Sequence, residues 1–172
     1  MAPDLVSFSG LPGTGKSTLA RLLAGRLVAA GRAAVWLRID TIEEALAASA
    51  LAIEQAKDGG YVAAQGLARD NLRLGVSVVA DCVNPVAATR DAWAAVAVDS
   101  CARLNEVEVV CSDPAVHRAR IDARHAGGIG PDWARVVARD YRPWHRPVPR
   151  LDTAAGGPSD SLAPLVAALG LT

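Results

Sequence analysis

A glycine-rich stretch near the N-terminus carries the residue types that bind phosphate. Gly10-x-x-x-x-Gly15-Lys16-Ser17 follows a short apolar run and precedes a helical pattern, which is the context that a phosphate-binding loop requires. Glycines let the backbone turn tightly and direct N–H groups at phosphate oxygens, and the helix that follows adds the positive end of its dipole. The pattern predicts nucleotide binding by Gly10, Pro12, Gly13, Thr14, Gly15, Lys16, Ser17 and Thr18.

Two side chains of this loop and one aspartate further along the chain are candidates for phosphate and metal binding. We expect Lys16 to reach the β- and γ-phosphates and the Ser17 hydroxyl to hold Mg²⁺. Asp81 ends the apolar run Val76–Asp81, where it could hold Mg²⁺ through water, contact a second substrate, or serve as a structural hydrogen-bond acceptor. The sequence therefore predicts a nucleotide with Mg²⁺.

The reaction class follows from motifs that accompany the loop or are missing beside it. No Asn-Lys-x-Asp motif is present, which argues against a GTPase. The run that ends at Asp81 carries no adjacent glutamate, although motor ATPases use one to activate water. A phosphotransferase needs a base for the acceptor hydroxyl and cations that close over the phosphoryl group. The sequence offers candidates for both.

Asp40 is the candidate base. It ends the run Ala33–Asp40, which reads as a strand, and ligands of open parallel sheets bind outside the carboxyl ends of the strands. A carboxylate there can accept a hydroxyl proton and direct the oxygen at a γ-phosphate. The alternative is a helix cap, but Thr41 and Glu44 fit a capping box and would already cap that helix.

Arginines in the second half of the chain are candidates for contacting the transferred phosphate. Residues 113–150 hold eight arginines and four aspartates, whereas residues 41–75 hold five acidic and three basic side chains. We expect 113–150 to form a mobile lid and 41–75 to bind the acceptor. Arg124 is the first candidate for a transition-state contact and Arg120 the second, with a solvated arginine face as the alternative.

Several further residues have weaker assignments. Asn84 fits a helix cap before Pro85, and Arg90 could reach substrate or lie on a solvated face. The loop that starts at Asp152 is a candidate for backbone contacts to adenine. The three histidines show no metal-ligand spacing and are expected at the surface or at helix caps; they are His117, His125 and His145. Three aromatic residues are expected to anchor the lid to the core; they are Trp133, Tyr141 and Trp144.

Short β-type runs alternate with longer helical patterns, which predicts an α/β fold with a parallel sheet covered on both faces. The expected strands are 5–9, 33–40, 76–81, 107–111 and 149–151. The expected helices are 16–30, 42–50, 61–74, 85–104, 114–125, 131–141 and 162–169. A chain of 172 residues suits one domain with a real core.

Composition limits the partners. The formal charge is +0, which argues against a long polyanion such as duplex DNA, because binding a phosphate backbone needs a basic excess. No apolar run is long enough for a membrane helix, and no charged region followed by an apolar stretch starts the chain. Three cysteines without a CxxC pair are expected to be buried free thiols. We expect a cytoplasmic protein of open oligomeric state.

The whole pattern resembles the small P-loop kinases. The resemblance rests on GLPGTGKSTLA, Asp40, VVADCVNP, HRARIDAR and PDWARVVARDYRPW, and covers nearly the whole chain. That group includes the kinase domain of phage polynucleotide kinase, zeta toxins, chloramphenicol phosphotransferase, gluconate kinase and adenylylsulfate kinase. The resemblance implies a three-layer P-loop fold with a parallel five-stranded sheet and a small arginine-rich lid. It also implies ATP with Mg²⁺ as donor, Asp40 as base and lid arginines over the phosphates.

Acceptors differ between members of the group, so three functions stay open. The first is transfer from ATP to a hydroxyl of a small molecule, for which the slightly acidic segment 41–75 favours a neutral or cationic compound. The second is a 5′-hydroxyl nucleic-acid kinase or an adenylylsulfate kinase. The third, of another class, is a nucleotide-binding regulator or partner-dependent ATPase without an acceptor.

Overall fold

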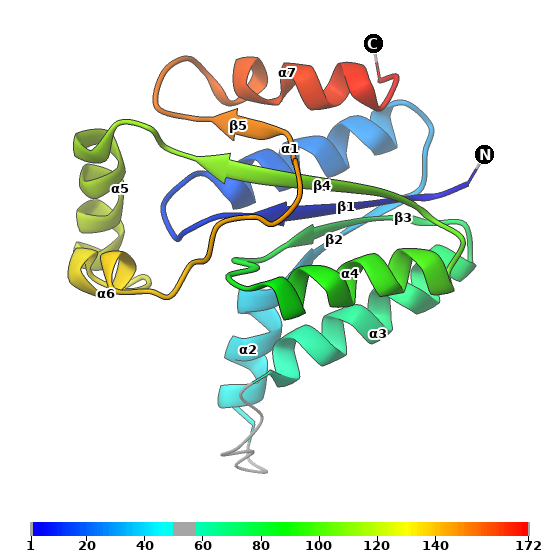
Figure 1. Ribbon diagram of the computed structural model, residues 1–172, viewed down its shortest axis with the longest axis horizontal. Coiled ribbons are helices and arrows are strands. Elements are labelled where there is room, and N and C mark those ends of the chain that lie inside the picture. The colour runs from blue at the N-terminus through cyan, green and yellow to red at the C-terminus, as the bar shows by residue number, and fades with distance from the viewer. Residues whose placement is uncertain (1, 50–57, 172) are drawn as a thin grey trace.

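A computed structural model describes residues 2–49 and 58–171 (Figure 1). The strands are β1 (Asp4–Ser9), β2 (Ala34–Arg38), β3 (Ser77–Asp81), β4 (Arg103–Val110) and β5 (Arg150–Asp152). The helices are α1 (Lys16–Ala29), α2 (Ile39–Ala47), α3 (Gly59–Arg73), α4 (Ala87–Asp99), α5 (Pro114–Ala126), α6 (Trp133–Val137) and α7 (Pro158–Ala168). The fold is therefore of the expected α/β class.

The five strands form one parallel sheet in the order β2-β3-β1-β4-β5. The phosphate loop leaves the central strand β1, with β3 and then β2 on one side and β4 and then β5 on the other. The register aligns Phe8 of β1 and Arg38 of β2 with Asp81 of β3. The sheet thus brings the ends of β1, β2 and β3 to one edge, as parallel α/β sheets require.

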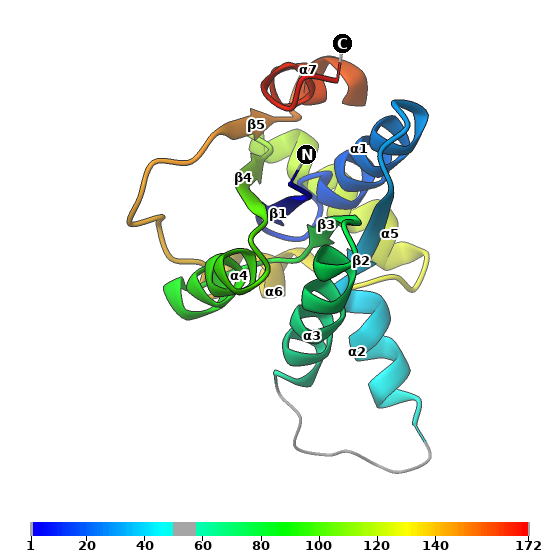
Figure 2. The same ribbon diagram turned by 90° about the vertical axis from the view of Figure 1, so that its right-hand side faces the viewer.

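Alternating side chains of the strands build a core on each face of the sheet. On one face, Val6 and Phe8 of β1 pack with α1 and α7. On the other face, Leu5 of β1 packs with α3 and α4, and Trp93 is fully buried there. Figure 2 shows α1 and α7 on one side of the sheet and α3 and α4 on the other. The three-layer P-loop arrangement is confirmed.

Several predicted element boundaries are wrong, among them the end of the second strand, which affects the site, and the end of the helix before the fourth strand. The second strand ends at Arg38, and α2 begins at Ile39, so Asp40 lies in the first turn of a helix. Thr41 is therefore inside α2 and cannot be the cap of the predicted capping box. The predicted helix 85–104 is shorter, because α4 ends at Asp99 and Arg103 already starts β4.

Asn84 does not cap a helix. It is fully buried with a left-handed backbone (φ 47°), and its side-chain amide donates to Ser7 Oγ and Ser9 Oγ at 2.9 and 3.2 Å. The residue preceding α4 is Val86. Asn84 instead connects the loop after β3 to the central strand β1. The neighbouring residue Val83 accepts the N–H of Gly10 at its backbone oxygen, so this loop also supports the start of the phosphate loop.

Arg90 neither reaches a substrate nor lies on a solvated face. It is 1% exposed and donates to the backbone oxygens of Asn84 and Arg142 at 2.9 and 2.7 Å, with further bonds to Pro143 and Pro85. Its guanidinium lies 4.3 Å from the centre of the Trp144 ring and 5.2 Å from that of Tyr141. The expectation that these two aromatic residues anchor the second half of the chain is confirmed.

Other sequence expectations are corrected in part. The cysteines are free, but Cys101 is exposed and Cys111 is half-buried, so only Cys82 is a buried thiol. His117 is buried rather than at the surface. Part of the predicted helix 42–50 lies outside the described residues. In the ranges that the structure describes, no helix is both long and apolar enough to cross a membrane.

We predict that replacing Arg90 by methionine destabilises the protein by about 3 kcal/mol, because four backbone carbonyls lose a charged donor in a buried setting. Denaturant unfolding measures the change. Arg21→Met on the exposed side of α1 is the control and should change the free energy of unfolding by about 0.5 kcal/mol or less. Equal effects of the two substitutions would contradict the assignment.

Candidate active site

The phosphate loop has the backbone geometry of an anion cradle. Gly10, Gly13 and Gly15 all have positive φ angles, of 140°, 80° and 93°, which favour glycine. A side chain at Gly10 would also overlap the Val109 carbonyl oxygen, and one at Gly13 would collide with Ile121. The loop therefore needs glycine both for its conformation and for the space around it. Successive backbone N–H groups in a glycine loop of this kind can bind an anion.

Helix α5 packs directly on this loop. His117 Nε2 donates to Pro12 O at 2.7 Å, and the edge of the His117 ring meets the Trp133 ring at 5.2 Å between centroids. Ile121 covers Gly13 from the same helix. No local sequence pattern indicates this role of His117, because its partner is a backbone oxygen 105 residues away.

Lys16 is 8% exposed, and its Nζ donates to Leu11 O at 2.9 Å. Burial lowers the pKa of the ammonium group, whereas the carboxylates of Asp81 and Asp40 raise it. The amine thus bonds to the phosphate loop at Leu11 O and also interacts with the carboxylates of Asp81 and Asp40. Phosphate oxygens would compensate the cost of burying this cation better than the single carbonyl does.

Ser17 and Asp81 form a pair that fits a Mg²⁺ ion. The Ser17 hydroxyl is hydrogen-bonded to the Asp81 carboxylate, whose side chain is 4% exposed. Among the described residues, Asp81 Oδ2 has no hydrogen-bond partner. Burial raises the pKa of Asp81, and the Ser17 hydrogen bond and Lys16 lower it. Hard oxygen donors of this kind, one carboxylate and one hydroxyl beside phosphates, suit Mg²⁺.

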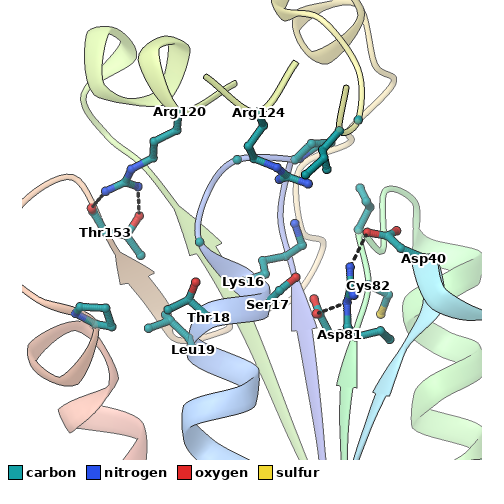
Figure 3. Close-up of a pocket in the computed structure, with 18 of the residues that line it drawn as sticks. Lys16, Ser17, Thr18, Leu19, Asp40, Asp81, Cys82, Arg120, Arg124 and Thr153 are labelled. Carbon is teal, nitrogen blue, oxygen red and sulfur yellow. Dashed lines mark hydrogen bonds and ion pairs between the residues drawn. The ribbon is translucent and has the colours of Figure 1, made fainter. Parts of the chain in front are cut away.

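Asp40 lies across the cavity from the phosphate loop, as Figure 3 shows. Its side chain is 56% exposed, and Arg38 Nη2 lies 3.8 Å from its Oδ2. The same guanidinium approaches Asp81, with Arg38 Nε 3.8 Å from Asp81 Oδ2. An exposed carboxylate in this position can accept a proton from a hydroxyl group.

Arg120 is engaged with the loop that follows β5. Its two terminal nitrogens donate to Thr153 Oγ1 and Thr153 O at 2.9 and 2.7 Å (Figure 3). Thr153 Oγ1 in turn donates to Thr14 O at 2.7 Å. Asp152 accepts the backbone N–H groups of Ser112 and Ala154, both at 3.0 Å. The Asp152 carboxylate thus shapes the turn, and backbone groups beyond it remain the candidates for contact with a base.

Arg124 faces the cavity close to Lys16 (Figure 3), and its charge lowers the pKa of that lysine. Most other arginines of 113–150 have partners. Arg118, Arg142, Arg146 and Arg150 form ion pairs with Asp122, Asp140, Glu106 and Glu108, respectively. The positive charge counted from the sequence is therefore largely compensated, and the arginines that line the cavity in this segment are Arg120, Arg124 and Arg139.

One cavity of about 820 Å³ joins these groups. It is lined by the predicted residues Pro12, Gly13, Gly15, Lys16, Ser17, Thr18, Asp40, Asp81, Arg120 and Arg124. Gly10 and Thr14 are absent from the lining, because they shape the loop from behind; Thr14 Oγ1 donates to Leu11 O at 2.9 Å. Asp152 is also outside it.

Several lining residues were not predicted from the sequence, among them Arg38, Glu43, Glu44, Arg139 and Thr153. Asp40, Glu43 and Glu44 have helical spacing and line the cavity together. A prediction that placed Asp40 in the first turn of a helix would have identified this face. Arg38 required the strand register, which pairs it with Asp81.

Comparisons with known proteins agree with this fold. A family model described as an AAA domain matches residues 5–141. No curated protein matches the sequence. The APS kinase of Mycobacterium tuberculosis, solved with AMPPNP and APS, superposes with a TM-score of 0.73 at 22% identity, covering 98% of both chains.

Two further solved structures share the fold at low identity. Kti12 of Chaetomium thermophilum, in complex with ADP-AlF3, has a TM-score of 0.73 and 18% identity over 96% of this chain and 97% of its own. A gluconokinase of Sinorhizobium meliloti 1021 has a TM-score of 0.58 and 18% identity over 98% and 97%. The family model covers most of the chain, so the chain belongs to the AAA-domain family, and the solved structures show that it shares the fold of these P-loop proteins.

Proposed function

We propose that the protein transfers the γ-phosphate of ATP to a hydroxyl group of a small molecule. The observation that carries this proposal is that Asp40 and the phosphate loop line the same cavity of about 820 Å³. Phosphoryl transfer needs a cradle for the phosphates and, within reach of it, a group that receives the proton of the acceptor. The cavity offers both.

On the donor side, the backbone of residues 10–15 would bind the phosphate chain, and Lys16 would neutralise its terminal charge. Ser17 and Asp81 would hold Mg²⁺, directly or through water. Bound Mg²⁺ supplies charge neutralisation at the β- and γ-phosphates. The buried Asp81 oxygen without a hydrogen-bond partner among the described residues supports this assignment.

On the acceptor side, Asp40 would accept the hydroxyl proton and orient the oxygen toward the phosphate. Its side chain is exposed toward the cavity, where a hydroxyl compound can reach it, and Arg38 Nη2 lies 3.8 Å from its Oδ2. The placement of Asp40 at the start of α2 does not remove this role, because the first turn of α2 lines the cavity.

We infer that 1–172 is one kinase domain in which residues 113–150 close over the phosphates. Arg124 is the better candidate for contacting the transferred phosphate, because Arg120 would first have to release Thr153. Closure would exclude water and bring positive charge to the transition state. The free thiols support a reducing, cytoplasmic setting.

The acceptor side of the cavity favours a neutral or positively charged compound. Asp40, Glu43, Glu44 and Asp81 line it, against Arg38 and Arg139. Arg38 already lies beside two of the carboxylates. Repulsion by the surplus negative charge would disfavour an anionic acceptor. The proposed acceptor segment 41–75 includes residues 50–57, which lie outside the described residues.

A matched set of acceptors tests this charge preference. We predict label transfer from ATP to neutral or amine-bearing hydroxyl compounds at least about 10-fold faster than to their carboxylates, as for glucose, glucosamine and gluconate, because one unfavourable charge costs about 1.4 kcal/mol or more.

The full screen is a metabolite and antibiotic library with labelled ATP. Preferred transfer to adenylylsulfate or to an oligonucleotide 5′ end would contradict the acceptor class. Tight ATP binding that no hydroxyl compound converts into transfer would contradict the kinase assignment.

Two substitutions separate donor binding from chemistry. We predict that Lys16→Met weakens ATP binding and abolishes transfer, whereas Asp40→Asn lowers transfer by about 10²–10⁴-fold with ATP affinity retained, as loss of a general base does. Calorimetry measures affinity, and labelled transfer to the compound found in the screen measures activity. Asp70→Asn, an exposed carboxylate on α3, is the control. Transfer by Asp40→Asn at the original rate would exclude Asp40 as base.

A further inference from the structure

Glu43 and Arg139 bring opposite charges to the cavity from different elements, and neither side chain has a partner in the described part of the chain. Glu43 lies in α2, and Arg139 follows α6 in the segment 113–150. Both residues are exposed and line the cavity. Among residues 2–49 and 58–171, neither side chain forms a hydrogen bond or an ion pair. Both charged groups are therefore free to bind a ligand.

The two charges lie close enough to act on each other. Burial and the charge of Asp40 raise the pKa of Glu43, whereas the charge of Arg139 lowers it. No ion pair joins these two described residues, so a gap remains between the carboxylate and the guanidinium. A ligand that carries one charge of each sign would complement both groups at once.

The packing of α2 on α3 fixes the position of Glu43. A side chain at Gly60 of α3 would overlap Cγ of Glu43, so the stem of the glutamate passes directly over the α3 backbone. Glu43 comes three residues after Asp40 in the same helix, and this spacing separates the two Cβ atoms by about 5–6 Å. A ligand group bound by Glu43 would thus lie about one helical turn from the hydroxyl group that faces Asp40.

We propose that the acceptor carries an ammonium group and a carboxylate in addition to its hydroxyl group, and that Glu43 and Arg139 bind them. Glu43 would accept hydrogen bonds from the ammonium group, and the planar guanidinium of Arg139 would donate two parallel hydrogen bonds to the carboxylate. An acceptor with an ammonium group alone would leave Arg139 without a partner. This inference rests on the proposed function, because it names the acceptor class of that same site, and its zero net charge agrees with the charge preference proposed above.

Three hydroxyl compounds that differ only in these groups test the inference. Homoserine carries both charges, 3-amino-1-propanol lacks its carboxylate, and 4-hydroxybutyrate lacks its ammonium group. With labelled ATP, we expect kcat/KM for homoserine at least about 10-fold above that for either analogue, because each analogue loses one charge-assisted contact. The amine should be the better of the two analogues, since the surplus negative charge of the cavity repels a lone carboxylate.

Two variants assign the contacts. Glu43→Gln should lower the ratio of kcat/KM for homoserine over 4-hydroxybutyrate by about 10-fold, and Arg139→Gln should lower the ratio for homoserine over 3-amino-1-propanol by about 10-fold. Asp70→Asn on α3 and Arg135→Gln on α6 are the controls, because both residues are exposed and neither lines the cavity. Both ratios should stay unchanged in the controls, and a loss of stability alone would lower every rate without changing the ratios.

The outcomes separate this inference from the proposed function. Equal rates with the three compounds, faster transfer to either analogue, or a best acceptor in the library that carries one charge or none would overturn the inference and leave the proposed function intact. An unchanged ratio in Glu43→Gln or in Arg139→Gln would overturn it as well. No transfer to any hydroxyl compound of the library would contradict the proposed function itself.

Discussion

Parallel pairing of β1, β2 and β3 is the constraint on which the site depends. It places the start of the phosphate loop, Arg38 and Asp81 at one edge of the sheet, in register. Apolar side chains on both faces hold that register, since slipping by one residue would exchange the faces of every strand. The charged groups are therefore brought together by the packing of apolar residues on the two faces of the sheet, rather than by their own attraction.

Electrostatic balance inside the cavity follows from this geometry. Lys16 is buried beside two carboxylates, and Asp81 is buried with an oxygen that has no hydrogen-bond partner in the described part of the chain. Such an arrangement is costly in an empty cavity and becomes favourable when phosphate oxygens and a metal ion compensate the charges. In segment 113–150, by contrast, most arginines are held by partners, and Arg124 faces the cavity.

The phosphate loop and the α/β class could be predicted because they depend on local patterns, glycine spacing and apolar runs. Asp40 was predicted as a cavity residue on a partly wrong basis. The strand ends two residues earlier, and Asp40 lines the cavity from the first turn of α2 rather than from a strand end. Arg90 and His117 could not be assigned, since their partners are backbone oxygens up to 105 residues away. Arg38 depended on strand register, which no local pattern encodes.

The most direct test of the account is a crystal structure of the protein with AMPPNP and Mg²⁺. We predict the β- and γ-phosphates against the backbone of residues 13–17, with Lys16 turned from Leu11 O to phosphate. The metal ion should lie between Ser17 and Asp81, and Asp40 should face the γ-phosphate across open space. A nucleotide bound elsewhere, or phosphates in the loop with Asp40 turned away from the cavity, would contradict the account.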